Sequence, residues 1–115
     1  MANDCIFCRI ISGDIPSETV YRDDDIVAFR DVHPVAPTHI LIVPRRHITD
    51  VNELRDGDAD LIGRIVLVAR RLAKEEGIAD SGYRLAINCG PDGGQKVMHL
   101  HMHLIGGRRL DDSLG

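Results

Sequence analysis

Three histidines stand at every second position of the segment MHLHMHLIGG, residues 98–107, and alternate with apolar residues. They are His99, His101 and His103, half of the six histidines in the chain. A β-strand places alternate side chains on one face, so we expect the three imidazoles on one side of a sheet and the apolar residues on the other. Imidazole can bind a metal ion, transfer a proton or act as a nucleophile near neutral pH.

The spacing of a strand decides between these roles. Same-face neighbours lie roughly 6.6 Å apart and the outer pair about 13 Å apart, whereas a zinc–nitrogen bond is about 2.0–2.1 Å long. Two neighbouring histidines could share one ion, but all three could not, so the row must be divided between roles. Alternating histidines can also form a half-buried polar surface without chemistry. Three of them in five residues, after a Gly-Gly-Gln loop, favour a site in which one neutral imidazole attacks phosphorus and another donates to its oxygens.

Composition narrows the class of protein. The 115 residues are 43% hydrophobic and 28% charged, which predicts a single globular domain spanning 1–115. The net charge of −4 provides no electrostatic footprint for nucleic acid or a membrane surface. Neither a membrane-spanning apolar run nor a signal-peptide core is visible, so we expect a cytoplasmic protein.

Hydrophobic periodicity predicts an α+β fold, a mainly antiparallel sheet of about five strands with one long helix and a short N-terminal helix. The long helix is expected from Asp58, as N-cap, to Glu76, with Gly77 just past its end. Short turns between consecutive strands favour antiparallel pairing. The short helix is expected within residues 5–14, and the strands over 19–24, 25–32, 39–44, 83–90 and 97–106.

The segment HLHMHLI fits the His-φ-His-φ-His-φ-φ signature, φ being apolar, and the chain resembles the histidine triad superfamily. CIFCRIISGDIPS, AFRDVHPVAPTHILIVPRRHI and GGQKVMHLHMHLIGGR resemble its Hint branch of nucleoside phosphoramidases, in order and spacing, from Cys5 to Arg108. The resemblance implies a HIT-like fold and a homodimer whose sheets join. It also implies hydrolysis or transfer at the α-phosphorus of a purine nucleoside phosphoramidate or acyl-nucleotide, through a nucleotidyl-histidine intermediate that releases a nucleoside monophosphate.

The resemblance also assigns residue roles. His101 is similar to the nucleophile, His103 to the donor to the α-phosphate, and His39 to a more remote histidine of the site. The nucleotide contacts that it implies are Asp31 and Val32 for the ribose, Ile6, Phe7, Ile10 and Phe29 for the base, and Asn88 and Gln95 for the phosphate. Simple core packing is an alternative for Ile6, Ile10 and Phe29.

Lys96 departs from the family pattern, because many Hint proteins have Ser or Thr directly after the GGQ, where it can assist the leaving group. A lysine there can contact the phosphate as a point charge or point to solvent. The preferred leaving group is therefore left open.

The Cys5-x-x-Cys8 pair indicates redox chemistry or zinc in a cytosolic protein. No strand precedes the pair, which argues against a thioredoxin-like motif and favours zinc. The resemblance implies a structural Cys2His2 zinc site of Cys5, Cys8, His47 and His99, closed to water. Buried thiols without a metal are the alternative. If zinc binds His99, the three histidines are divided between roles, as the strand spacing requires. The third cysteine, Cys89, is expected to be a core residue.

Two other functions remain open. One is a dinucleoside polyphosphate hydrolase of the same superfamily, although the short C-terminus and the GGR segment favour the Hint branch. The other is a nucleotide-binding or partner-binding module with incidental activity. The intact triad favours an enzyme.

Overall fold

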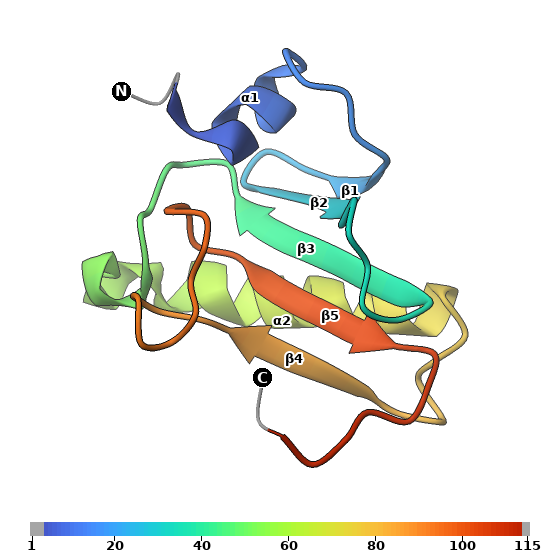
Figure 1. Ribbon diagram of the computed structural model, residues 1–115. Helices are drawn as coiled ribbons and strands as arrows, with labels where there is room; N and C mark the ends of the chain where they lie inside the picture. Colours follow the sequence, from blue (N-terminus) through green and yellow to red (C-terminus); the bar gives the residue numbers. More distant parts are fainter. Residues whose placement is uncertain (1–3, 114–115) are drawn as a thin grey trace.

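The computed structural model describes residues 4–113 and shows one five-stranded sheet with a helix on each face (Figure 1). Its sheet order is β1-β2-β3-β5-β4, and all four strand pairings are antiparallel. The predicted α+β class is confirmed. The elements are α1 (Ile6–Ser12), β1 (Thr19–Arg22), β2 (Ile26–Arg30), β3 (Thr38–Pro44), the 3-10 turns η2 (Val51–Glu53) and η3 (Asp56–Asp58), α2 (Ala59–Glu75), β4 (Tyr83–Ile87) and β5 (Met102–Gly106).

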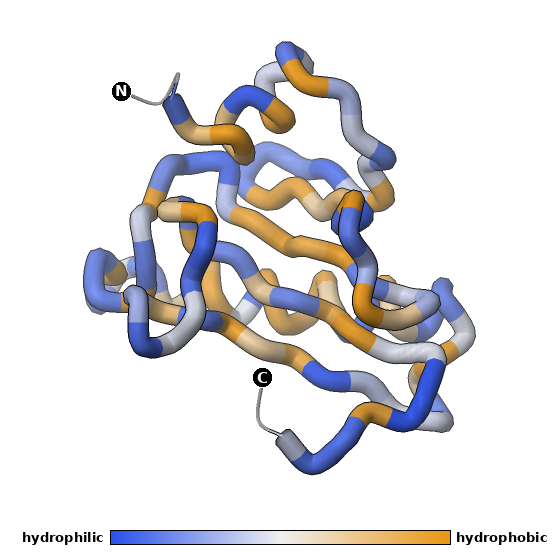
Figure 2. Tube along the Cα trace, in the orientation of Figure 1, coloured by the Kyte–Doolittle hydropathy of each residue, from blue (hydrophilic) through white to orange (hydrophobic). Residues whose placement is uncertain are grey.

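The centre of the sheet is β3, in which every residue is buried. It pairs with β2 on one side and with β5 on the other, and Leu41 lies opposite His103 across the β3–β5 ladder. Figure 2 shows that β3 is hydrophobic along most of its length, whereas hydrophilic and hydrophobic segments alternate along β5. The strand that carries a histidine of the triad is thus held in the interior of the sheet by apolar neighbours.

Helix α2 covers one face of the sheet, behind it in Figure 1. Its apolar stripe packs on the side chains of that face, and Ile65, Ala69 and Leu72 are almost completely buried. The helix ends where Gly77 adopts a φ of 76°, as predicted. Among the described residues, no helix is both long enough and apolar enough to cross a membrane.

Asp58 is the N-cap residue of α2, as predicted, but its side chain does not cap the helix. Instead it accepts hydrogen bonds from Arg46 Nη2 at 2.6 Å and from the Arg55 backbone N–H at 2.9 Å. The carboxylate of Asp58 thus links the turn η3 to the loop after β3.

Helix α1 packs on the opposite face of the sheet. Phe7 is buried against Phe29, with ring centroids 5.4 Å apart, and the same cluster contains Leu41. Cys5 caps the N-terminus of the helix, where its Sγ accepts from the Cys8 backbone N–H at 3.4 Å, and Gly13 caps the C-terminus with a φ of 89°. Seven residues are too few for a stable isolated helix, so tertiary contacts must hold α1 in place.

The last two strands are shorter than predicted. β4 ends at Ile87 and β5 begins at Met102, so His99 and His101 lie before the strand rather than in it. The physical reason is that this segment bonds elsewhere: the Leu100 backbone N–H donates to the Ile48 carbonyl in the loop after β3, at 2.6 Å. The three histidines are therefore divided between a loop and a strand.

Candidate active site and metal site

His101 is held with one ring nitrogen free to act as a base or nucleophile. Its Nδ1 lies 2.7 Å from the backbone carbonyl of His99. Since a carbonyl only accepts, Nδ1 carries the proton and donates. Burial lowers the pKa of His101 below its ordinary value, against the opposing effect of that hydrogen bond. The ring is thus neutral at pH 7, and the lone pair is on Nε2.

His103 has the opposite tautomer, which a chain of three groups fixes. The Val35 backbone N–H donates to Nδ1 of His39 at 3.2 Å, so Nε2 of His39 carries the proton. That nitrogen lies 2.9 Å from Nδ1 of His103, which must accept, and the proton of His103 is therefore on Nε2. Burial lowers the pKa of His103 to about 4 and also lowers that of His39, so both rings are neutral.

The rings of His101 and His103 are adjacent, with centroids 4.9 Å apart. One offers a lone pair and the other an N–H, and this is the pair of functions that attack on a phosphate ester requires. Asp31 lies beside them, with Oδ2 3.5 Å from Nε2 of His39. Because that nitrogen carries a proton, the group of Asp31, His39 and His103 does not offer three lone pairs to a metal ion.

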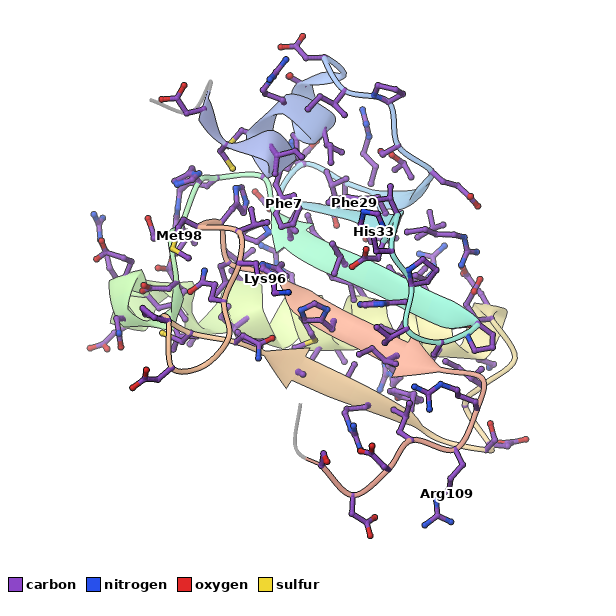
Figure 3. All side chains as sticks on the ribbon, viewed as in Figure 1. Phe7, Phe29, His33, Lys96, Met98 and Arg109 are labelled. Atoms are coloured by element: carbon purple, nitrogen blue, oxygen red, sulfur yellow. The ribbon has the colours of Figure 1, made fainter. Side chains whose placement is uncertain are left out.

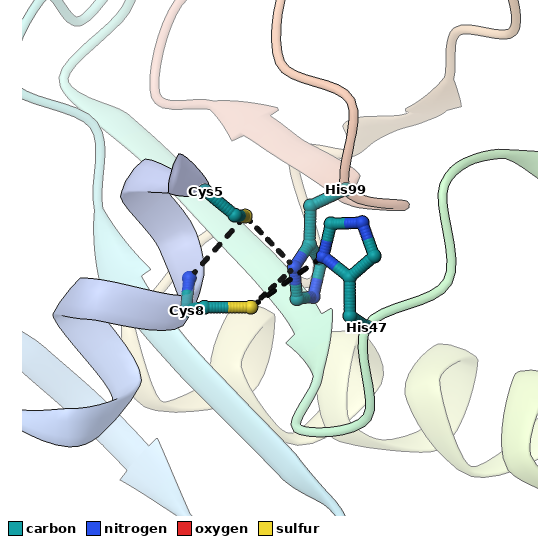
Figure 4. Close-up of side chains that lie close together, drawn as sticks. All are labelled: Cys5, Cys8, His47 and His99. Carbon is teal, nitrogen blue, oxygen red and sulfur yellow. Dashed lines mark hydrogen bonds between the residues drawn. The ribbon is translucent and has the colours of Figure 1, made fainter. Parts of the chain in front are cut away.

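His99 belongs to a separate cluster with the two N-terminal cysteines (Figure 4). Its Nε2 donates to the Pro44 carbonyl at 2.8 Å, which leaves the lone pair of Nδ1 directed at sulfur. Nδ1 lies 3.3 Å from Cys5 Sγ and 3.6 Å from Cys8 Sγ. His47 completes the set from the loop after β3, with Nδ1 3.4 Å from Cys8 Sγ.

The four donor atoms fit a tetrahedral zinc ion. Zn–S and Zn–N bonds of about 2.3 Å and 2.05 Å at the tetrahedral angle would separate sulfur and nitrogen by about 3.6 Å, and all four atoms lie within 4.8 Å of one another. Burial and the neighbouring Cys5 raise the pKa of the Cys8 thiol to about 11. Burial also lowers the pKa of His99 to about 4, so that ring is neutral as a ligand must be.

An open cleft of about 940 Å³ runs from α1 across the sheet to β4 and contains both His101 and His103. The predicted base contacts Ile6, Phe7, Ile10 and Phe29 all line it. Phe7 and Phe29 are also buried in the core, so packing and cleft lining coincide at these two residues. Asp31 and the exposed Val32 line the rim of the cleft at the end of β2.

The Gly-rich loop positions its polar residues differently. Asn88 and Lys96 line the cleft, and Asn88 Nδ2 donates to the Gly93 carbonyl at 2.7 Å. Gln95 is buried beneath the loop: its Nε2 donates to the Thr49 and Val97 carbonyls, and its Oε1 accepts from the Gly90 N–H. The geometry therefore favours a bracing role for Gln95 over direct contact with a phosphate.

Several groups at the site have no sequence signal of their own. The carbonyl of Pro44 and the N–H of Val35 set tautomers, and any residue type other than proline offers both groups. Arg84 and Arg108 line the cleft at its β4 end. The sequence does not show that Arg84 lies near the triad, because this follows from the pairing of β4 with β5.

Comparison with known proteins agrees with this geometry. The family model for the HIT domain matches residues 12–110. Purine nucleoside phosphoramidase of Escherichia coli strain K12 is 50% identical over 114 residues, which cover 99% of this chain and 96% of that protein. A 14 kDa zinc-binding protein of Brassica juncea is 46% identical over 110 residues, 94% of this chain and 96% of that protein.

Among solved structures, a HIT family hydrolase from Legionella pneumophila Philadelphia 1 superposes with a TM-score of 0.94 at 46% identity, covering 96% of this chain and 99% of that one. The chain belongs to the HIT domain family. The prediction of a hydrolase of the histidine triad type is confirmed by these relatives.

Proposed function

We propose that the protein cleaves purine nucleoside phosphoramidates or acyl-nucleotides at the α-phosphorus, through a covalent intermediate on His101. The observation that carries the proposal is the opposite tautomers of His101 and His103 in adjacent rings. A lone pair for attack and an N–H for the phosphate oxygens then face one cleft. The name of the E. coli relative supports a purine nucleoside phosphoramidate as the substrate.

In the first step, Nε2 of His101 attacks the α-phosphorus and forms a P–N bond. The bond from phosphorus to the leaving nitrogen breaks, and the amine departs with a proton taken from solvent. The Nε2–H of His103 donates to a non-bridging phosphate oxygen, whose negative charge grows during attack. His39 acts as a positioning residue, because it holds the accepting nitrogen of His103 away from the substrate.

In the second step, water attacks the phosphorus of the adduct, and the bond from phosphorus to Nε2 breaks. The water loses a proton to solvent, the nucleoside monophosphate leaves, and His101 regains its lone pair. We place the base between the apolar side chains of α1 and β2, and the ribose hydroxyls at Asp31. In this arrangement Val32 covers the ribose, and Asn88 and Lys96 face the phosphate.

Zinc has a structural role in this proposal. Cys5, Cys8, His47 and His99 would hold it, and it would supply a cross-link rather than a Lewis acid, because all four positions are taken by protein. The Brassica juncea relative named as zinc-binding supports this site. The cross-link joins α1 to the loops before β5 and after β3.

We further propose a homodimer of single HIT domains, 1–115, in the cytoplasm. β4 is an edge strand whose residues are all partly exposed, and it can pair with β4 of a second copy. The other edge strand, β1, has an irregular register with β2 between Thr19 and Tyr21, which makes it a poorer template.

The decisive experiment combines kinetics with trapping. Wild type incubated with adenosine 5′-phosphoramidate and quenched should yield a peptide containing residues 98–107 with the added mass of the nucleotidyl group. His101→Asn should yield no adduct and lose at least about 10³-fold in kcat. His33→Ala, which removes a different cleft histidine, should retain the adduct, and thermal melting checks the fold of each variant.

The same assay separates the alternatives. Faster cleavage of diadenosine tetraphosphate than of the phosphoramidate would identify a polyphosphate hydrolase. Tight nucleotide binding without turnover would identify a binding module. Unchanged hydrolysis by His101→Asn would overturn the assignment of the nucleophile.

A further inference from the structure

The cleft extends beyond the triad to β4, and the binding mode proposed above leaves this part free of the nucleoside. Its floor is the sheet face that carries the triad: Ala86 of β4 lies directly opposite His103, and Arg84 lies opposite Ile105. Directly opposed residues share a face, so Arg84 and Ala86 lie on the same face as His103. The segment after β5 forms the far wall, where Arg108 and Asp111 line the cleft. We call this region the β4 half.

Three cations, Arg84, Lys96 and Arg108, line the cleft, and none forms an ion pair with a carboxylate of residues 4–113. Within residues 4–113, Arg84, Lys96 and Arg108 have no carboxylate oxygen within 4 Å. Backbone carbonyls hold the two arginines in place: Arg84 Nη2 donates to the Asp111 carbonyl at 2.6 Å, and Arg108 Nε donates to the Val35 carbonyl at 3.0 Å. Such contacts orient a guanidinium without cancelling its charge.

Among the described residues, the two carboxylates that line the cleft, Asp31 and Asp111, form no ion pair with these cations. Asp31 lies next to His39, whose strand β3 borders β5 on the side away from β4, and it forms no ion pair with the three cations. In Asp111, Oδ1 accepts from the Ser113 backbone N–H, at 3.0 Å. By contrast Arg30, which also lines the cleft, is fully paired with Glu18 and Glu76. Apart from the paired Arg30, the cleft lining therefore carries three cations, Arg84, Lys96 and Arg108, and two carboxylates that form no ion pair with them, Asp31 and Asp111.

Lys96 is the cation best placed to meet a reacting group. It follows the GGQ turn, lines the same cleft as His101, and its side chain is exposed. Figure 3 shows it directed across the sheet face toward β5 rather than away from the molecule, whereas Arg109 points outward. Of the two alternatives for this residue, the structure favours the one in which its ammonium faces the site.

We propose that the β4 half is a leaving-group subsite selective for an anionic group, with Lys96 as its specificity-determining residue. This inference rests on the proposed function. With the nucleoside in the α1 half and His101 at the phosphorus, the group being displaced extends into the β4 half. An ammonium and two guanidiniums attract a carboxylate or phosphate on that group and repel an amine.

The test uses two matched probes, the adenosine 5′-phosphoramidates of glycine and of glycinamide, which differ in one terminal charge. The kcat/KM ratio of glycine to glycinamide is measured for wild type and for Lys96→Met, so that the intrinsic reactivities of the two amines cancel. The ratio should fall about fivefold in Lys96→Met. Lys96→Arg should retain the wild-type ratio, and Lys96→Glu should lower it further.

Arg109→Met is the control, because it removes a nearby positive charge that does not line the cleft. Its ratio should match wild type, and the wild-type preference should shrink as KCl is raised. A third probe, adenosine 5′-triphosphate, separates the sources of charge. An effect of Lys96→Met on the glycine probe identifies a carboxylate as the ligand, and an effect on the triphosphate alone identifies a phosphate.

The inference is overturned if Lys96→Met changes neither the glycine-to-glycinamide ratio of kcat/KM nor the activity on adenosine 5′-triphosphate. It is also overturned if Arg109→Met changes that ratio as much as Lys96→Met does. That outcome is distinct from failure of the proposed function. If wild type hydrolyses neither phosphoramidate, the proposed reaction itself is wrong. If it hydrolyses both with ratios independent of Lys96, only the anionic subsite is rejected.

Discussion

Nε2 of His39 lies 2.9 Å from Nδ1 of His103, across the β3–β5 ladder. This contact orients the proton of His103 toward the cleft, and the backbone N–H of Val35 fixes the tautomer of His39 in turn. The tautomer of His103 is therefore set by a residue on a neighbouring strand.

His39→Leu should consequently lower kcat by about 10- to 100-fold with a smaller change in KM, because it releases the tautomer without removing a substrate contact. His39→Gln can still donate to Nδ1 and should recover part of the loss. Steady-state kinetics on adenosine 5′-phosphoramidate measures both effects. Equal losses for leucine and glutamine would argue that His39 only fills space.

Removal of zinc should loosen α1. Elemental analysis is expected to give one zinc per chain, and exhaustive chelation or Cys8→Ser should lower Tm by roughly 10 °C, about 2 kcal/mol. Cys89→Ser is the matched control, since Cys89 lies outside the four-residue cluster. A purified protein that is free of metal and as stable as the loaded form would refute the site.

Glu76 should make stability depend on acid pH. It accepts from Arg30 Nη1 and Nη2 at 2.8 and 2.9 Å, and this pairing lowers its pKa below the ordinary 4.5. A carboxyl whose folded pKa is depressed stabilises the fold above its unfolded pKa and loses that contribution as pH falls through the folded value.

Glu76→Gln should therefore cost about 1 kcal/mol of unfolding free energy at pH 7 and less at an acid pH, where the carboxyl of Glu76 becomes protonated. Urea titrations at the two pH values provide the comparison. Glu75→Gln, which breaks the exposed pair with Arg71, should have a much smaller effect at either pH. A Glu76 effect that persists unchanged in acid would show that charge is not its cause.

Gly93 is required by close packing within the Gly-rich loop. A Cβ there would collide with the backbone carbonyl oxygen of Cys89, which cannot move aside as a flexible side chain could. Gly93→Ala should shift the Gly-rich loop, and with it the Gly93 carbonyl that accepts from Asn88. This shift should lower kcat/KM about tenfold or more. Gly57→Ala, where a Cβ meets nothing within 4 Å, should behave like wild type in the same assay.

The regular elements were predictable where one signal dominated. The 3.6 period of α2 reflects burial of one face of the helix, and the apolar run of β3 reflects burial of both faces of the strand. The bounds of both elements agree with the prediction within a residue or two. The last strand was overextended because alternation continues through residues 97–101. The sequence does not show that the N–H of Leu100 bonds to Ile48 instead of to a strand.

The residue types of the site were also visible in sequence, but their protonation pattern was not. Tautomers depend on backbone groups such as the carbonyls of Pro44 and His99, which every residue type offers. The cation-lined half of the cleft depends on the register that places Arg84 on the face of His103. Such relationships arise from pairing across long stretches of chain, and local patterns do not encode them.

Phe7 touches two of the three triad residues at once. Its ring lies edge-on to His99 and to His101, with centroids 5.9 and 5.1 Å away, while the same side chain forms the wall of the cleft. One wall of the cleft and the ring of His101 are thereby held at a fixed separation. If the base packs on Phe7 and the phosphorus lies at His101, as proposed, this separation sets the span from base to phosphorus that a substrate must have.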